Sequence, residues 1–599
     1  MGQTSEITSF LNVHRDQLIS SGVPEHYWQT LYNKLVHQLF DASNCFELLK
    51  VERDETEEHE HQPAFILSAT KDIKKSDTQH IYLIDHAWTF KIQDSKKQLM
   101  ENDGLRERIC RMLDVDCNLE RNELVDELFK KIWKINNFYS ISNADEVENR
   151  LPIWYVMDEV GTAVIHSDSP NCRVIPFVYI NDQITYSLLF PLEDINEGDV
   201  IFRDFAGGVN DPIRRDVVLL PWVYKSLESM SVDPPIPGEE YFLTGHVKES
   251  LPDLSKLELN YKHKPDILKV FSQYDLVNAH LTYNKFVIVD DPADADILWY
   301  TQHFKDFQKL SETPGKFINQ FPFEYVLTVK DLLCVTCRRS QNSLRWLPIS
   351  YNLVTESGHF ASCFQRREKN GSDNYWIVKP YNLARSLDIH ITNNLDYILR
   401  VSLTGPKIAQ KYITNPVVFH RPECGGKVKF DIRYVLLLES TKPLKAYVYK
   451  NFFLRFANKP FELNDFQDYE KHFTVMNYTD SANLKHMKCS DFLLNWMVQY
   501  PDFDWKTIEK SIFEMLKNIL ESATMAEPPC GLAHNPQSRA VYAADIMLKW
   551  TEDGEIEPNI LEINFTPDCQ RACDYYPEFY NDIFKLLFLN ENVDTMVLL

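Results

Sequence analysis

The sequence predicts an α+β protein with two parts, a β-rich N-terminal domain followed by a C-terminal α/β domain. Short runs of β-type residues dominate residues 65–205, and a helical pattern over 122–135 interrupts them. Beyond residue 262, strand and helix patterns alternate, which is typical of an α/β domain. A proline-rich segment at 233–238 indicates a linker between the two parts.

The apolar periodicity sets the boundaries that we predict. An apolar stripe at helical spacing from Ile7 to Phe40 indicates helices at the N-terminus. Predicted strands of the C-terminal part include 267–271, 286–289 and 297–300, and a helix follows over 325–334. We therefore predict a helical N-terminal segment at 1–46, the β-rich domain at 47–230, a linker at 231–262 and the α/β domain at 263–599.

Composition narrows the classes of protein. The chain has 599 residues, of which 44% are hydrophobic and 13% aromatic, so it is long and apolar enough for a large core. No apolar run approaches the roughly 18 residues of a membrane span, and the N-terminus lacks the pattern of a signal peptide. Twelve cysteines without a disulfide framework indicate a reducing cytosol or nucleus. We expect the CxxC at Cys334 and the CxxxC at Cys569 to be ordinary buried thiols, because no second pair completes a zinc site.

The formal net charge is −24. This charge disfavours direct binding of nucleic acid by the whole chain and permits a basic partner such as a histone tail. An acidic partner would require a groove that is locally basic.

A hairpin near the C-terminus carries the candidate metal ligands. A predicted strand holds Asp545 in an apolar run, a polar turn covers 551–555, and a second strand covers 560–565. Because side chains alternate faces along a strand, Glu562 and Asn564 share a face, and Asp545 joins them if the strands pair. Two carboxylates and an amide oxygen suit Mg²⁺. The alternative is a half-exposed edge hairpin with a polar face.

Cationic side chains on the preceding strands could bind phosphates. Lys379 ends a buried strand, and Arg455 lies in an aromatic run. Lys429, Asp431 and Arg433 share one face of a strand that alternates cleanly. Each could belong to an exposed, ion-paired face. Together with the hairpin carboxylates they supply the groups that phosphoryl transfer needs, cations for phosphates and oxygens for Mg²⁺.

These motifs, in this order, resemble the tubulin–tyrosine ligase-like family, ATP-grasp ligases that add amino acids to tubulin tails. The resemblance covers roughly residues 265–590. It rests on Lys379-Pro380, Gln410-Lys411-Tyr412-Ile413, Lys429-Phe430-Asp431-Ile432-Arg433, Arg455-Phe456-Ala457, His472-Phe473-Thr474 and Leu561-Glu562-Ile563-Asn564, with Ile318-Asn319-Gln320-Phe321-Pro322 and Lys330-Asp331 upstream.

The resemblance implies a role for each matching residue. ATP and Mg²⁺ are the implied cofactors, and tubulin with its acidic tails is the implied partner. Lys379 would contact the α- and β-phosphates. The adenine hinge would comprise Gln410, Lys411, Tyr412 and Ile413, and the Mg²⁺ ligands would be Asp545, Glu562 and Asn564. The groove for ATP, the amino acid and the acidic tail would be lined by Lys429, Asp431, Arg433 and Arg455, with the two arginines as the catalytic pair.

Two departures from the family bear on activity. The family follows its Lys-Pro with a flexible Gly-x-Gly, whereas Ser386 and Asp388 stand at those glycine positions here. Glycine allows close approach of backbone N–H groups to phosphate, and Asp388 adds a negative charge, so closure over the nucleotide should be weakened. The second departure is Val475-Met476 after Thr474, where the family tends to have Asn directly.

A second resemblance lies in the N-terminal part. The run from His166 to Cys172 and the run from Gly198 to Phe205 are similar to two segments of the SET lysine-methyltransferase fold. Phe205 stands in place of the tyrosine whose hydroxyl that family uses beside the substrate amine. The resemblance implies a SET-like fold with impaired chemistry. The alternative is an unrelated β domain with a chance His-Ser-x-x-Pro-Asn turn.

Three functions remain open from the sequence. The first is a tubulin-binding pseudo-ligase that regulates modification of tubulin tails, such as tyrosination or glutamylation, without catalysing it. The second is an active, atypical ATP-dependent ligase. The third is a lysine methyltransferase or histone-binding module. We expect a cytoplasmic, microtubule-associated protein that can also be nuclear.

Overall fold

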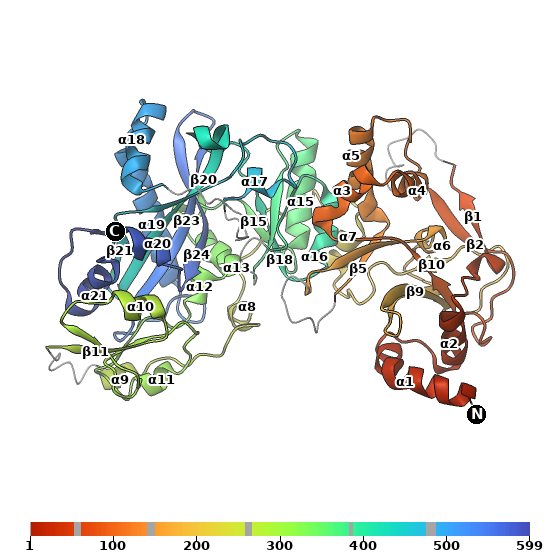
Figure 1. Cartoon of the computed structure of the whole chain (residues 1–599), viewed down its shortest axis with the longest axis horizontal. Coiled ribbons are helices and arrows are strands. Elements are labelled where there is room, and N and C mark those ends of the chain that lie inside the picture. The colour runs from red at the N-terminus through yellow and green to blue at the C-terminus, as the bar shows by residue number, and fades with distance from the viewer. Residues whose placement is uncertain (1, 53–61, 141–149, 258–265, 382–386, 475–486) are drawn as a thin grey trace. The chain divides into compact units, whose positions relative to one another are not determined.

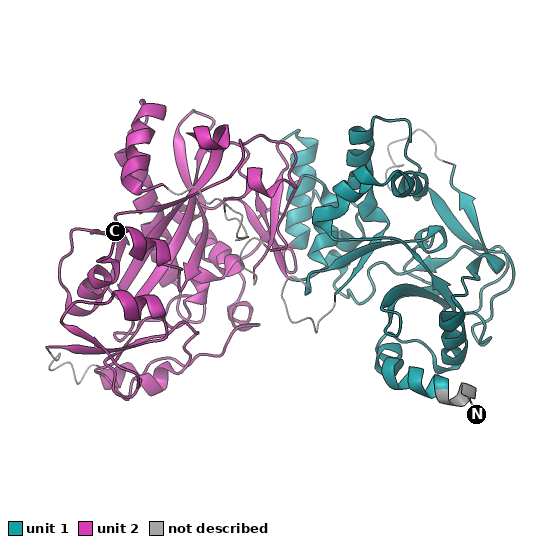
Figure 2. Ribbon diagram, in the orientation of Figure 1, with its two compact units in different colours: residues 1–231, 357–372, 393–405 teal, residues 232–356, 373–392, 406–599 magenta. Residues whose placement is uncertain are grey.

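The computed structural model describes residues 2–52, 62–140, 150–257, 266–381, 387–474 and 487–599 (Figure 1). The chain forms two compact units (Figure 2). Unit 1 comprises residues 1–231, 357–372 and 393–405, and unit 2 comprises residues 232–356, 373–392 and 406–599. The predicted fold class is confirmed, since β-rich unit 1 precedes an α/β unit 2 along most of the chain. No helix of the described residues is both long and apolar enough to cross a bilayer.

Unit 1 begins with two helices that cover a three-stranded antiparallel sheet. Their apolar residues Phe10 and Leu31 pack in one cluster with Phe177 and Leu188 of the sheet. The helices are α1 (Gly2–Ser20) and α2 (Trp28–His37), and the sheet has the order β3 (Tyr82–Ile84), β9 (Ile184–Pro191), β8 (Cys172–Tyr179).

Small sheets and further helices, α3 to α7, make up the rest of the N-terminal part of unit 1; α6 covers Glu159–Thr162 and α7 covers Pro212–Leu219. The sheets are β1 (Phe46–Lys50) with β2 (Phe65–Ala69); β4 (His86–Phe90), β6 (Ile153–Met157) and β5 (Asn136–Tyr139); and β7 (Ile165–His166) parallel to β10 (Phe202–Arg203). The first three of these helices are α3 (Ile92–Glu101), α4 (Asp103–Leu113) and α5 (Arg121–Lys131). A disulfide joins Cys110 to Cys117, which the cysteine pattern did not predict. The thiols of Cys334 and Cys569 are free and buried, as predicted.

Two helices from the second half of the sequence belong to unit 1, namely α15 (Ser357–Lys369) and α16 (Leu395–Ser402). Gln365 of α15 donates a hydrogen bond to the carbonyl of Lys225 (2.9 Å) and accepts one from the amide of Leu227 (2.7 Å). Tyr397 of α16 stacks on Trp133 with ring centroids 3.9 Å apart. These contacts complete the core of unit 1 with segments that the sequence analysis assigned to the C-terminal domain.

The described residues of unit 2 form three sheets. A parallel sheet has the order β12 (Phe286–Ile288), β11 (Leu268–Ser272), β13 (Ile297–Trp299), β14 (Phe317–Ile318). An antiparallel sheet has the order β15 (Ser350–Asn352), β18 (Lys407–Lys411), β16 (Trp376–Pro380), β17 (His390–Thr392). The largest sheet has the order β24 (Ile556–Phe565), β23 (Ala540–Trp550), β20 (Gly426–Thr441), β21 (Leu444–Tyr449), β25 (Met596–Leu598), with β19 (Val418–Arg421) and β22 (Phe453–Phe456) also paired to β20.

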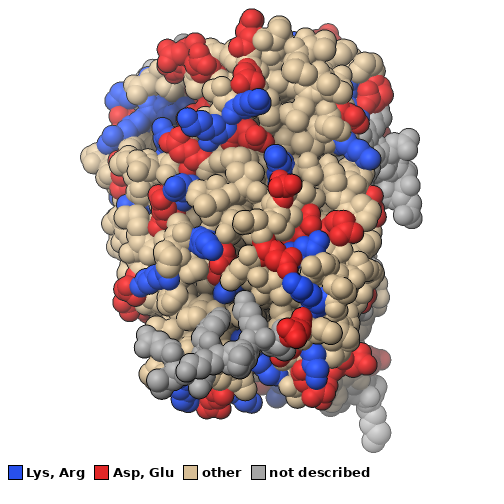
Figure 3. Space-filling view, turned by 90° about the vertical axis from the view of Figure 1, so that its left-hand side faces the viewer, with Lys and Arg blue, Asp and Glu red and all other residues tan. Residues whose placement is uncertain are grey.

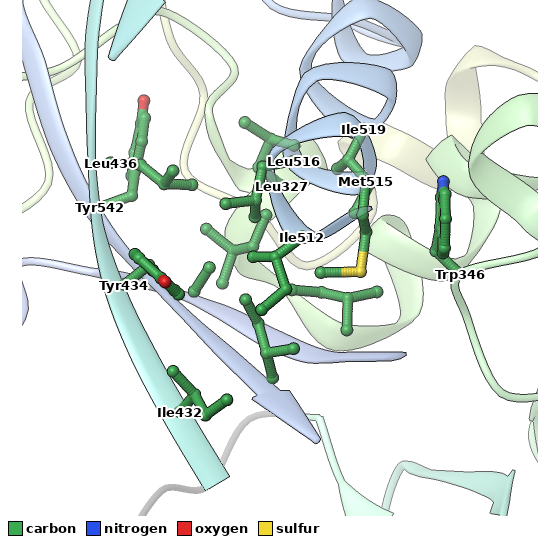
Figure 4. Packing of buried hydrophobic residues seen from close by; sticks show 14 of the residues in the cluster. Leu327, Trp346, Ile432, Tyr434, Leu436, Ile512, Met515, Leu516, Ile519 and Tyr542 are labelled. Carbon is green, nitrogen blue, oxygen red and sulfur yellow. The ribbon is translucent and has the colours of Figure 1, made fainter. Parts of the chain in front are cut away.

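Strand β20 is the centre of unit 2 because both of its faces are buried. One face packs on α19 (Trp505–Met525), where Ile512, Met515 and Ile519 follow helical spacing and meet Tyr434 (Figure 4). The other face carries Val435, in the same cluster as α21 (Phe579–Leu589). A strand that is buried on both faces is expected to be almost entirely apolar. The few charged residues of β20 are therefore candidates for a functional role.

The segment that we expected to be a linker is packed along unit 2 from residue 232 to residue 257. Phe242 is fully buried in the main core. The hydroxyl of Tyr241 donates to Asp331 (3.0 Å). The buried carboxylate of Glu249 contacts His303 (2.5 Å) and accepts from the amide of Phe323 (2.7 Å). These contacts hold the segment in a defined path rather than as a free spacer.

Candidate nucleotide and metal site

The predicted hairpin is present, and it brings the three candidate metal ligands together. Strands β23 and β24 pair antiparallel with Asp545 opposite Glu562. The amide of Asn564 donates to Asp545 and to Glu562, at 3.2 Å each. After Asp545 the register shifts, so that Ile546 pairs with Ile560. This bulge leaves Leu561 half-buried.

Strands β20 and β22 each place one arginine beside this hairpin. Arg433 lies opposite Asp545 and binds it through two hydrogen bonds of 2.7 and 2.8 Å. Arg455 of β22 donates to Asp431 (2.7 Å) and to Asp545 (2.8 Å). The hydroxyl of Thr474 donates to the other oxygen of Asp431. Burial alone would raise the pKa of Asp545, but Arg455 and Arg433 hold it well below its ordinary value, so this carboxylate is ionised at neutral pH.

Lys330 also contacts the hairpin, and the sequence analysis did not select it as a site residue. It begins helix α13 (Lys330–Arg338), and its ammonium lies 3.2 Å from a carboxylate oxygen of Glu562. The Lys330-Asp331 motif was noted only as part of the family resemblance. Its position in the site depends on packing between α13 and a strand more than 200 residues later, which periodicity does not reveal.

Lys379 projects from β16 into the interior of unit 2, in the neighbourhood of Glu562. Its ammonium donates to the amide oxygen of Gln410 on β18 (2.9 Å), and that amide donates to the hydroxyl of Ser350 (2.9 Å). Burial lowers the pKa of Lys379 to about 8, although the negative charge of Glu562 opposes this shift. The lysine therefore carries its charge at neutral pH and loses it within a range that experiments can reach.

The remaining predicted hinge and groove residues are more enclosed than the sequence suggested. Lys411 forms an ion pair with Asp373 (2.8 Å), and Tyr412 and Ile413 are buried. Lys429 is also buried, and its ammonium donates to the hydroxyl of Tyr412 (2.8 Å). Burial lowers the pKa of Lys429 to about 7. Their proposed contacts with adenine and substrate remain predictions.

Asp388, which stands at the second glycine position of the family's Gly-x-Gly segment (called the phosphate loop below), is held by ion pairs within the protein. This residue has φ of 54°, a left-handed conformation that glycine adopts freely and that aspartate tolerates. Its carboxylate binds Lys407 (2.8 Å), which is fully buried, and His390 (2.9 Å). Its negative charge is thus paired within the protein. Ser386, Val475 and Met476 lie outside the described residues.

The SET-like motif of unit 1 is held by backbone contacts. The side chain of Asn171 donates to the carbonyl of Val200 and accepts from the amide of Phe202, both at 2.8 Å. His166 stacks on Phe205, and the guanidinium carbon of Arg203 lies 4.6 Å from the centre of the Phe205 ring. Asn171 therefore joins the segment before β8 to the segment that leads into β10. The phenyl ring of Phe205 carries no hydroxyl.

The three sheets of unit 2, with carboxylates on one hairpin and a buried lysine on an adjacent antiparallel sheet, define an ATP-grasp-like domain. Its donor set of two carboxylates and an amide oxygen fits Mg²⁺, which would neutralise phosphate charge there. Among the described residues, no cluster of three or more His, Cys, Asp or Glu side chains forms another candidate metal site.

Comparison with known proteins gives the family. The sequence model of the tubulin-tyrosine ligase family matches residues 308–597, and that of the tubulin tyrosine ligase SET-like domain matches residues 53–226. The chain is 42% identical to tubulin–tyrosine ligase-like protein 12 of Homo sapiens, over 98% of this chain and 96% of that protein. The Caenorhabditis elegans protein of the same name is 35% identical, over 98% of both chains. A probable tubulin polyglutamylase of Mus musculus is 26% identical, over 50% of this chain and 56% of its own length. This chain belongs to the tubulin–tyrosine ligase family and includes the SET-like domain.

Raising the pH from 7 to 9 is expected to weaken Mg-ATP binding about tenfold, through the loss of one charge-assisted contact. The predicted phosphate contact requires the charged form of Lys379, which persists only below the folded pKa of about 8. Calorimetric titrations at several pH values would measure the slope. Lys379→Met should bind weakly at every pH with a flatter profile, and parallel profiles for the two proteins would assign the pH dependence to another group.

Proposed function

We propose that this chain is a tubulin-binding pseudo-ligase, which binds Mg-ATP and regulates the modification of tubulin tails without catalysing it. The ion pairs of Asp388 carry the proposal. Family members would need the phosphate loop to fold over the triphosphate, but Asp388 is tied to Lys407 and His390. Releasing it would leave the buried ammonium of Lys407 without this carboxylate, which is costly.

The charge of the site supports an acidic partner. Lys330, Lys379, Arg433 and Arg455 surround only three carboxylates, so the site has a net positive charge although the chain is strongly acidic. On the face of the molecule in Figure 3, basic and acidic side chains are interspersed among the described residues. Attraction for an acidic tubulin tail would therefore come from the site rather than from a basic surface on that face.

A ligation assay tests the proposal directly. Purified chain, tubulin, Mg-ATP and labelled tyrosine, glutamate or glycine should give no incorporation above background, because the loop does not close over the nucleotide. The chain should still co-sediment with microtubules and should do so less when the tubulin tails are removed. It should also lower incorporation by an active tubulin ligase added to the same reaction.

Robust incorporation by the purified chain would contradict the pseudo-ligase and favour the second candidate, an active atypical ligase. One observation favours that alternative, which is that the hairpin retains all three metal-donor residues. Loss of incorporation in Glu562→Gln would then assign the activity to this site.

The cytoplasmic, microtubule-associated location follows from this proposal, and a nuclear pool and histone tails remain further proposals. Histone binding would use the SET-like domain and the negative net charge of the chain. Methyl transfer has less support, because Phe205 supplies no hydroxyl beside a substrate amine.

A further inference from the structure

Unit 1 holds two arginines close to each other, of which Arg400 is buried and Arg203 is half-buried. Arg203 lies on β10, and Arg400 lies on α16 and is 6% exposed. Their guanidinium carbons lie over two aromatic rings, 4.6 Å from the centre of Phe205 and 4.9 Å from that of Trp222. Those ring centres are 4.4 Å apart, so the two cations occupy one small region.

No carboxylate of the described residues forms an ion pair with either arginine. Arg203 donates to the side-chain oxygen of Asn137 (3.3 Å), and Arg400 donates to the carbonyl of Asn136 (2.6 Å). By contrast, Arg215 of the same unit is bound by two aspartates. Burial lowers the pKa of Arg203 to about 10 and that of Arg400 to about 9, so both remain charged at neutral pH.

Several polar atoms in this region have no hydrogen-bond partner within the described parts of the chain. They are Nε of Arg203, Nε of Arg400 and both polar side-chain atoms of the fully buried Asn136. Native proteins leave few buried polar groups unpaired, and a cluster of them indicates a missing binding partner. Two guanidinium charges share this region without an ion-paired carboxylate, although Asp396 acts on Arg400 electrostatically, and this makes that partner an anion.

A cavity of about 1380 Å³ in unit 1 adjoins this region. Phe205, Trp222 and Lys134 form part of its wall, as does Ile135, the neighbour of Asn136 in the sequence. Lys130 also lines it. The cavity therefore offers room for a small molecule, and its wall carries charged side chains of both signs, with Glu127 and Asp396 beside the two lysines.

We propose that Arg203 and Arg400 form a binding site for a phosphate-type oxyanion, with the adjoining cavity holding the organic part of a phosphorylated small molecule. A guanidinium group offers a planar fork of donors that matches phosphate, and contact with the rings of Phe205 and Trp222 restrains the position of each group. The same contact argues against a methylated lysine as the ligand, because the ring faces already carry cations.

Calorimetry with inorganic phosphate and with glycerol 3-phosphate tests this site, at constant ionic strength in chloride. The full chain with Lys379→Met should be used throughout, so that phosphate binding in unit 2 is weakened. Adding Arg400→Gln or Arg203→Gln should each weaken binding about tenfold or more. Lys50→Gln is the matched control, because it removes an exposed cation of unit 1 that is ion-paired with Asp114 and does not line the cavity, so it should bind as its parent does.

The two ligands distinguish the source of the anion. Equal affinity would indicate a site for free phosphate, and tighter binding of glycerol 3-phosphate would show that the cavity holds the organic part. If the parent protein binds neither ligand, or if both arginine variants bind as the parent does, the proposal is wrong. Arg203 is less buried than Arg400, so Arg203→Gln provides the test should Arg400→Gln fail to fold.

Discussion

Replacing Asp545 with asparagine is expected to lower the free energy of unfolding by about 3–5 kcal/mol, the usual cost of breaking a buried ion pair from one side. The carboxylate is 1% exposed and neutralises both Arg433 and Arg455. An amide of the same size keeps the packing but leaves two buried guanidinium groups without this counter-charge. Urea unfolding followed by circular dichroism would measure the change.

The control for this variant lies on the same hairpin. Glu557→Gln breaks a half-exposed ion pair with Lys549 and should cost at most about 1 kcal/mol. The pKa of Asp545 is depressed in the folded state, so its stabilisation is present above the unfolded pKa, near 3.8, and is lost as the pH falls towards the folded value. The difference between the two variants should therefore shrink in acid. Equal losses at neutral pH would show that the arginines do not depend on Asp545.

Replacing Glu562 with glutamine is expected to weaken Mg-ATP binding by roughly 100-fold or more, because it removes a charged oxygen ligand from the predicted metal site. Stability should change little, since Glu562 is half-buried and its one ion pair is with Lys330 at 3.2 Å. Calorimetry on the full chain would measure the affinity. A large loss of Mg-ATP binding without a loss of stability would show that Glu562 acts in binding alone. Asp545, by contrast, is expected to contribute to both binding and stability.

Glu557→Gln again provides the control and should bind Mg-ATP as the unsubstituted chain does. Binding that survives in Glu562→Gln would place the metal elsewhere. If the unsubstituted chain itself binds no Mg-ATP, the ATP-grasp-like fold serves contact with tubulin rather than chemistry. The proposal that this pseudo-ligase binds Mg-ATP would then be wrong, whereas the proposal that it binds tubulin would still stand.

Local patterns predicted the site best where neighbouring strands form it. The alternation of side chains along the two strands correctly predicted that Glu562 and Asn564 lie together beside Asp545. The prediction was possible because only a short turn separates the strands. The same reasoning placed Asp431 and Arg433 on one face of β20. It did not foresee the bulge at Leu561, since a one-residue register shift leaves no trace in composition.

Long-range packing explains what the sequence did not reveal. Lys330 reaches Glu562 only through the packing of a helix against a distant strand. The apolar stripe of α15 or α16 shows which face of the helix is buried, but not which unit buries it. The pairing of Cys110 with Cys117 likewise depends on the turn after α4, and seven-residue spacing alone does not predict it.

The divided sequence of unit 1 has a consequence for synthesis on the ribosome. Residues 1–231 emerge first, but the last segment of the unit, which contains α16, ends only at residue 405. At a translation rate of roughly 5–20 residues per second, synthesis of residues 232–405 takes about ten to thirty seconds after residue 231 is added. During that interval the apolar cluster of Val218 and Leu219 lacks its contact with Leu403. The nascent chain would thus expose an apolar surface while about half of unit 2 is still to be synthesised. We expect chaperones to bind during this interval.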